Sequence, residues 1–262
     1  SPIWKVRPGS LAPLSLDEVN APTFIYRRMW SSLQDIPNLQ AYKDWRDWNK
    51  LEGAATYEVY HNYANILSTS QASQYPDRFC YNAAGTPKQL NPDNQDVVAI
   101  AKQYAINSLS VTTPTKGADS NNYLFPGGVP ISPNDGPGWD SCYDPNNYQL
   151  ITDKVFNLSN EVAKTVSQTL PGKYVGVYSY AAYSCTPSIP LEPNLLVQIA
   201  TAYGYCDQSV SQRMAALAAK GVAIGIRDYY HVWVWTNENP PILKGKASGI
   251  PVYAANNVNV IN

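Results

Sequence analysis

Two aspartates stand where an apolar run of the chain gives way to a polar loop. Asp135 follows the apolar residues 129–131 in the stretch VPISPNDG, and Asp228 comes shortly after the apolar run 222–226. Glycoside hydrolysis uses two carboxyl groups that flank the scissile bond, one of them protonated at the working pH. We therefore predict a glycosidase-type site in which Asp135 is the general acid and Asp228 is the base or nucleophile.

Aromatic and short polar side chains accompany both aspartates. Aromatic rings present flat apolar faces on which the C–H face of a sugar ring can stack, and polar groups beside them can bind its hydroxyls. His61 could bind a hydroxyl or a carboxylate of the substrate, and Arg227 could pair with an acidic sugar. The predicted substrate-binding residues are His61, Asn134, Trp139, Tyr180, Arg227, Tyr229, Tyr230 and Trp233.

Each of these residues also has a purely structural interpretation. Asn, Asp, Gly and Pro are the residues that form turns, so Asp135 could serve only the turn in which it lies. Asp228 could pair with Arg227 or Arg213, and His61 could be a hydrogen-bonded structural histidine. The sequence leaves both interpretations open.

The composition argues against two classes of partner. Charged residues make up 15% of the 262 residues, and the formal net charge is −1, so the chain lacks the basic excess that binds phosphates in nucleic acids. Its apolar runs are shorter than the roughly 20 residues of a membrane span. The abundant Tyr and Trp favour a carbohydrate partner and an extracellular, cell-surface or virion location.

Four cysteines allow two redox states. They lie at positions 80, 142, 185 and 206, and none forms a Cys-x-x-Cys pair. With only two histidines in the chain, no zinc-ligand spacing is present, and we expect neither a metal nor a cofactor. The even count permits two disulfides in an oxidising compartment, and four buried thiols are the alternative.

Apolar periodicity predicts helices over 96–109, 148–170 and 209–220. Short apolar runs between and around them predict strands over 24–26, 55–60, 129–131, 174–180, 194–200, 222–226 and 251–254, with a further run at 78–81. Alternating strands and helices favour a parallel sheet, and seven or eight such units favour a (β/α)8 TIM-type barrel, incomplete at its last helix. An open doubly wound sheet is the alternative, although no Gly-x-Gly-x-x-Gly motif follows the first strand.

The domain division follows from these elements. Residues 1–21 are interpreted as an N-terminal extension, and residues 22–262 as the barrel. The sequence ends at Asn262, just after the last predicted strand. We therefore expect further domains or a partner chain to cover that strand.

Several short motifs occur in an order that resembles one known family. They are YH at 60–61, ISPNDG at 131–136, NEVA at 160–163, GVYSYA at 176–181 and IGIRDYY at 224–230. Together with neighbouring motifs they resemble a bacterial domain-of-unknown-function family related to the α-glucuronidase-type glycoside hydrolases. The resemblance implies a (β/α)8 barrel with glycosidase activity, and a uronic-acid-bearing polysaccharide is the substrate it suggests. It also implies that Asp135 and His61 occupy the positions of the family's strand-end Asp and early His.

The sequence departs from that family at two places. Only Cys142 stands near the Asp-Gly motif, where members usually carry several cysteines. Asn256 and Asn257 stand after the last predicted strand, where members tend to carry a Glu. Because an amide cannot act as a base or nucleophile, the alternative function is a catalytically degenerate carbohydrate-binding module. A structural module of an extracellular fibre, cell surface or phage tail is a further alternative.

Overall fold

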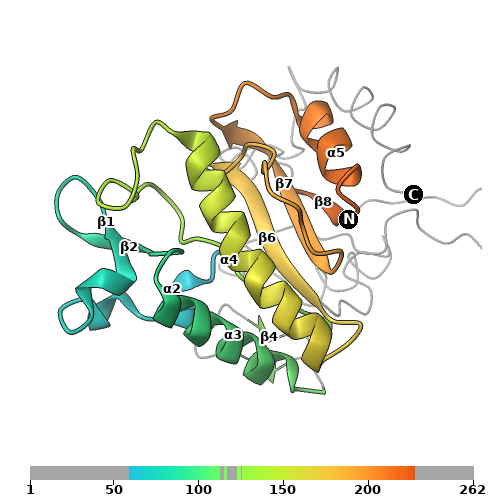
Figure 1. The fold of residues 1–262 in the computed structure, drawn as a ribbon, viewed down its shortest axis with the longest axis horizontal. Helices are drawn as coiled ribbons and strands as arrows, with labels where there is room; N and C mark the ends of the chain where they lie inside the picture. The colour runs from blue at the N-terminus through green and yellow to red at the C-terminus, as the bar shows by residue number, and fades with distance from the viewer. Residues whose placement is uncertain (1–58, 113–114, 117–122, 125, 228–262) are drawn as a thin grey trace, which may run out of the picture.

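The computed structural model describes residues 59–112, 115–116, 123–124 and 126–227 (Figure 1). Their main element is a four-stranded, wholly parallel sheet whose strands lie in chain order. The strands are β5 (Gly128–Pro130), β6 (Tyr174–Ala181), β7 (Leu195–Gly204) and β8 (Ala223–Arg227). All four lie close to strands predicted from the sequence, whereas the predicted strands at 24–26 and 251–254 lie outside the described residues.

The prediction of a (β/α)8 TIM-type barrel, incomplete at its last helix, is wrong. In such a barrel a helix follows every strand, but residues 182–194 connect β6 to β7 without a helix. The predicted strand at 78–81 is also of a different kind, because it pairs antiparallel with the next strand in a separate hairpin. The alternative was a doubly wound sheet, and the order β5-β6-β7-β8 contains no reversal within the residues that the structure describes.

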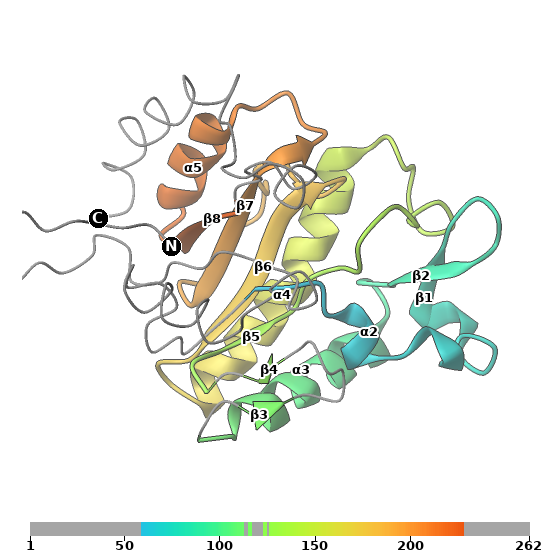
Figure 2. The ribbon, with the colours of Figure 1, turned by 180° about the vertical axis from the view of Figure 1, so that it is seen from behind.

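Three helices pack on one face of this sheet, as both ribbon views show (Figures 1 and 2). They are α3 (Gln95–Leu109), α4 (Tyr148–Thr169) and α5 (Val210–Ala218). Each begins at a residue whose side-chain oxygen accepts hydrogen bonds from the first turn, which satisfies amides that the helix itself leaves unbonded. These capping residues are Asn94, Asn147 and Ser209, and Ser209 forms a full capping box with Gln212. The sequence prediction of these helices is confirmed to within a few residues.

The remaining described elements are short. They precede the parallel sheet in the chain, and the first hairpin lies to one side of it (Figure 2). They are α2 (Tyr63–Ile66), the 3-10 turns Thr69–Gln71 and Pro76–Arg78, β1 (Phe79–Tyr81), β2 (Pro87–Leu90), β3 (Thr115–Lys116) and β4 (Tyr123–Leu124).

The two faces of the sheet differ in chemistry. On the helix side, Val177, Val197 and Ile199 are fully buried, and Arg213 of α5 reaches the hydroxyl of Ser179. Side chains alternate between faces along a strand, so Tyr178 and Tyr180 project from the opposite face of β6. The helices therefore leave the aromatic face of β6 to other segments of the chain.

Both possible disulfides are formed. Cys80 in β1 is bonded to Cys142 in the loop after β5, with Cα atoms 5.4 Å apart. Cys185 after β6 is bonded to Cys206 after β7, with Cα atoms 5.3 Å apart. Each bond thus ties down a loop that follows the carboxyl end of a parallel strand. The alternative of four free thiols is excluded, since no cysteine remains free.

Among the described helices, none has the length and apolar character needed to cross a bilayer.

Candidate functional site

The carboxyl ends of the parallel strands bring three predicted site residues into contact. The Tyr180 hydroxyl donates a hydrogen bond of 3.1 Å to Oδ1 of Asp135. Nε2 of His61 lies 3.7 Å from the same oxygen, and the ring centroids of His61 and Tyr180 are 5.6 Å apart. His61, Asp135 and Tyr180 come from three separate segments, and we call them the rim cluster.

Asp135 is presented by a loop that is fixed on both sides of it. The backbone amide of Asn134 donates to Oε1 of Gln89 over 2.9 Å, and Nε2 of Gln89 donates back to the carbonyls of Asn134 and Gly136. Gln89 itself is fully buried. The Gln89 side chain thus satisfies backbone groups of the loop on both sides of Asp135. The side chain of Asp135 itself stays 69% exposed.

A close backbone approach supports the same loop. Gly138 has a φ of +134°, and a Cβ atom there would lie 2.3 Å from Cβ of Lys88. Only glycine fits such a position without moving the hairpin. Together with the disulfide from Cys142 to Cys80 in β1, this contact with Lys88 in β2 holds the loop against the β1–β2 hairpin.

His61 is placed by its neighbour Asn62. The Asn62 side chain is fully buried and donates to the carbonyl of Pro130 over 2.7 Å, while its backbone amide donates to the carbonyl of Ser132. The Tyr178 hydroxyl donates to the carbonyl of Val59 over 2.6 Å. The segment before α2 is therefore bound to both β5 and β6, and this fixes the imidazole beside Asp135.

The His61 ring is partly removed from solvent, with 26% of its side chain exposed. Burial lowers its pKa below the ordinary value of 6.5, because the charged imidazolium loses hydration. The carbonyl of Pro133 and the carboxylate of Asp135 act in the opposite direction, and the nearby Arg227 adds to the lowering.

Arg227 joins the site at the end of β8. Its Nη1 donates to the Tyr178 hydroxyl, and its guanidinium carbon lies 5.0 Å from the centroid of the Tyr178 ring. The ring centroids of His61 and Tyr178 are in turn 5.1 Å apart. The Arg227 guanidinium and the His61 ring therefore both contact the Tyr178 ring, at the carboxyl end of the sheet.

Two other predicted site residues have structural contacts. The Asn134 side chain accepts from the amide of Ala64 and donates to the carbonyl of Lys88, so it joins two backbone segments. Trp139 is only 2% exposed and packs with Tyr143 at a ring distance of 6.2 Å. Neither has a described contact with the rim cluster. Asp228, Tyr229, Tyr230 and Trp233 lie outside the described residues.

Arg213, which the sequence offered as a partner of Asp228, lies on the helix side of the sheet. It is 4% exposed and donates to the carbonyls of Ser179, Ser184 and Ala200. From the helix side of the sheet, it therefore links the carboxyl end of β6 to that of β7.

The sequence analysis missed residues that position the site and one that borders it. Gln89 and Asn62 carry no motif, and their roles depend on partners 45 and 68 residues away. Tyr203 is 50% exposed, packs against Tyr180 at 6.2 Å and has a φ of +61°. A left-handed backbone at a non-glycine residue is uncommon and clusters at functional sites. A Tyr near the end of a predicted strand was the only available signal.

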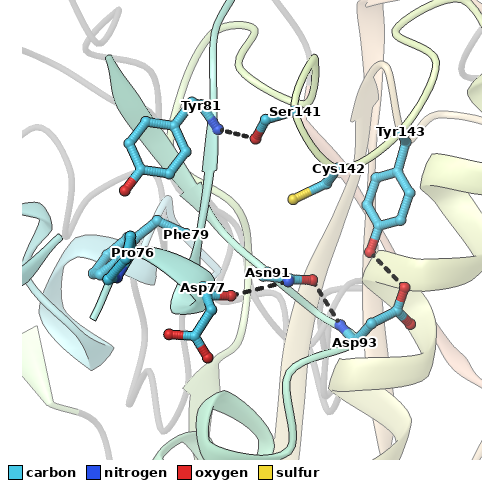
Figure 3. A pocket seen from close by; sticks show the side chains of 9 residues that line it. All are labelled: Pro76, Asp77, Phe79, Tyr81, Asn91, Asp93, Ser141, Cys142 and Tyr143. Atoms are coloured by element: carbon cyan, nitrogen blue, oxygen red, sulfur yellow. Dashed lines mark hydrogen bonds between the residues drawn. The ribbon is translucent and has the colours of Figure 1, made fainter. Parts of the chain in front are cut away.

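A pocket of about 440 Å³ lies elsewhere, between the β1–β2 hairpin and the loop at 141–143 (Figure 3). Its carboxylate Asp93 accepts from the Tyr143 hydroxyl over 3.0 Å and pairs with Lys154 at 2.7 Å. Burial and this carboxylate raise the pKa of Tyr143. Asp77, its other carboxylate, accepts from Nδ2 of Asn94 over 2.7 Å. Because both carboxylates already have partners and the pocket does not include the rim cluster, it is the weaker candidate.

The rim cluster itself contains two side chains of the kinds that commonly bind metals, His61 and Asp135. The part of the chain that the structure describes contains no group of three or more His, Cys, Asp or Glu side chains that could hold an ion. The cluster combines one imidazole, one carboxylate and phenols, which is a set for binding hydroxyls and moving protons.

Comparison with known families decides the chain's membership. The model of the family described as Domain of unknown function (DUF4838) matches residues 9–220. The chain belongs to the DUF4838 family. The match includes the whole rim cluster and begins inside the predicted N-terminal extension, whereas Arg227 and Asp228 lie past its end. No curated protein and no solved structure matches the chain.

Proposed function

We propose that this DUF4838 chain binds a polysaccharide at the carboxyl ends of β5, β6 and β8 and hydrolyses it as a glycosidase. The observation that carries the proposal is the rim cluster itself. A carboxylate, an imidazole and a phenol from distant segments meet where ligands of parallel α/β sheets commonly bind. A turn residue alone would not need Tyr180 and His61 beside it.

In this mechanism Asp135 supplies the proton to the leaving oxygen. Asp228 follows Arg227 directly in the chain and would act as base or nucleophile from the end of β8. Its separation from Asp135 would set the stereochemical outcome, with about 5 Å for retention and about 6.5–9.5 Å for inversion.

Arg227 supports an acidic sugar as substrate. Guanidinium groups bind carboxylates through two parallel hydrogen bonds. Arg227 lies close to the rim cluster, because Arg227 and His61 both contact the Tyr178 ring. This fits the proposed relationship to α-glucuronidase-type hydrolases and a uronic-acid-bearing polysaccharide.

The test is hydrolysis of aryl glycosides and uronic-acid oligosaccharides by the parent protein and by Asp135→Asn. Asp140→Asn is the matched control, because Asp140 is an exposed aspartate of the same loop. We expect turnover by the parent and the control, and loss of about 10²-fold or more in Asp135→Asn. Equal turnover by all three proteins would contradict the assignment of Asp135.

A carbohydrate-binding module without catalysis is the second candidate. It is favoured by the exposed rings of Tyr203 and Tyr205, which are 50% and 53% exposed and give an open aromatic surface suited to stacking. No turnover by the parent, combined with binding to a glycan array that Tyr203→Ala weakens, would support this function. For either function, the two disulfides favour an extracellular or cell-surface location.

A further inference from the structure

The bond from His61 to Pro133 fixes where the imidazole carries its hydrogen. Nδ1 of His61 lies 2.7 Å from the carbonyl oxygen of Pro133. A backbone carbonyl can only accept a hydrogen bond, so Nδ1 must donate. In the neutral ring the other nitrogen, Nε2, then has a bare lone pair.

That lone pair faces another acceptor. Nε2 lies 3.7 Å from Oδ1 of Asp135, which is too long for a direct hydrogen bond. Oδ1 already accepts from the Tyr180 hydroxyl over 3.1 Å and from the Gly136 amide over 2.9 Å. With a neutral His61 and an ionised Asp135, the pair therefore offers only acceptors to a ligand.

A ligand hydroxyl needs something different. It has one hydrogen to donate, and its oxygen accepts. To bridge His61 and the carboxylate of Asp135 it must find one donor and one acceptor, and the pair provides these when it carries exactly one proton. In that state the hydroxyl accepts from Nε2–H and donates to the carboxylate, or takes the reverse arrangement with the proton on Asp135.

We propose that the His61–Asp135 pair binds a sugar hydroxyl by taking up one proton, so that ligand affinity is coupled to pH at this pair. The chemical class of the ligand, a neutral or acidic sugar, rests on the proposed function. The coupling itself rests on the geometry of the two side chains.

The surroundings set the direction of the coupling. Asp135 favours a protonated His61, Arg227 at the end of β8 disfavours it, and the rings of Tyr178 and Tyr180 of β6 face the imidazole. Burial keeps the pKa of His61 low in the free protein. A hydroxyl that accepts from Nε2–H raises this pKa in the complex. Affinity should therefore rise as pH falls from the pKa of the complex to that of the free protein, by up to about tenfold per pH unit.

The experiment is ¹⁵N NMR of the histidine side chains in the full chain, with D-glucose, D-galactose and D-xylose as probes. These sugars carry no group that titrates near the pKa of histidine. We expect the neutral His61 ring to carry its hydrogen on Nδ1, and its pKa to rise in the presence of at least one sugar. The affinity of that sugar, measured by the same titration, should increase on acidification.

Asp135→Asn sharpens the test because an amide is both a donor and an acceptor without a proton. In this variant the hydroxyl can accept from the amide and donate to a neutral His61, so the pH dependence should flatten while binding at high pH persists. His61→Asn, which can keep the bond to Pro133, should also flatten it, and Asp140→Asn should leave it unchanged.

Three results would overturn the proposal. One is a neutral His61 with its hydrogen on Nε2. Another is sugar binding whose pH dependence is the same in Asp135→Asn and the parent. The last is a His61 pKa that none of the three sugars moves. Proton-coupled binding without hydrolysis would reject only the proposed enzyme activity, and hydrolysis without the coupling would reject only this inference.

Discussion

The two faces of the parallel sheet differ in what their side chains do. One face packs against the helices and stabilises the fold, and the other carries the aromatic residues of the candidate site. Residues Val177, Val197 and Ile199 face the helices and are fully buried, whereas Tyr178 and Tyr180 alternate with them and face His61. The same strand therefore supplies both functions, one residue apart. Substitutions on β6 and β7 can therefore be sorted by face before any measurement. Truncation of a buried apolar side chain on the helix face costs stability, whereas a change at a partly exposed residue of the other face, such as Tyr180, costs less.

The largest effect is expected on the helix face. Ile199→Ala removes a fully buried side chain and should lower the free energy of unfolding by about 2–5 kcal/mol, through lost apolar burial and a residual cavity. Denaturant unfolding measures this loss. Leu196→Ala, a partly buried position of β7 on the other face, is the control and should cost less. Equal losses at both positions would mean that the two faces do not differ as described.

The next effect tests the support of the rim cluster. Gln89→Ala removes the hydrogen bonds to the backbone of Asn134 and Gly136. It leaves buried polar groups without partners, which should cost about 1–3 kcal/mol. Because the loop also presents Asp135, sugar binding and hydrolysis should fall as well. A stability loss with unchanged sugar binding would show that the loop positions Asp135 without Gln89.

A smaller effect concerns pH and the stability of the fold. The pKa of His61 is lower in the folded protein than the ordinary value of 6.5. Above 6.5 both states are neutral at this residue and its contribution is fully present. As pH falls below 6.5 the unfolded chain binds a proton before the folded one does, so stability should decrease until the folded pKa is reached.

The measurement is the free energy of unfolding across this pH range for the parent and for His61→Asn. The variant cannot titrate here, so its curve should be shallower by at most one proton, or about 1.4 kcal/mol per pH unit. A steeper curve for the variant than for the parent would contradict the direction of the pKa shift.

The smallest stability effect is expected on the aromatic face. Tyr180→Phe deletes one hydrogen bond to a carboxylate that is 69% exposed, so unfolding should change by about 0.5 kcal/mol or less. Sugar affinity should nevertheless fall, because the carboxylate loses the donor that orients it. Tyr174→Phe at the other end of β6 is the control. A large stability loss in Tyr180→Phe with unchanged affinity would reverse the roles assigned to the two faces.

Local signals in the sequence predicted the local elements. The helix that begins at Tyr148 follows from its apolar periodicity, and its end follows from Pro171 and Gly172, the latter with a φ of +82°. The acid at the end of β5 was likewise predicted from an apolar run that meets turn residues. Its proximity to Tyr180 follows from the rule that strand ends of a parallel sheet share one edge. The rule does not account for His61, because residues 59–60 of the strand predicted before it form no strand and residues 55–58 lie outside the described part of the chain.

Long-range pairing could not be read in the same way. The barrel prediction counted apolar runs, but a run such as 78–81 looks the same in a hairpin as in a barrel strand. The choice between disulfides and free thiols also needed the fold, because it depends on which loops meet. Gln89 and Asn62 are polar residues without a local pattern, and only their distant backbone partners show why they are buried.

The Cys80–Cys142 bond has a consequence for proteolysis. It closes a covalent ring across 62 residues, so a protease that cuts one peptide bond inside the ring leaves two fragments that remain one molecule until a reductant is added. A cut between residues 80 and 134 would place His61 on one fragment and Asp135 on the other. Such a nicked protein would migrate as a single intact band without reductant, and the disulfide would still link the two halves of its rim cluster.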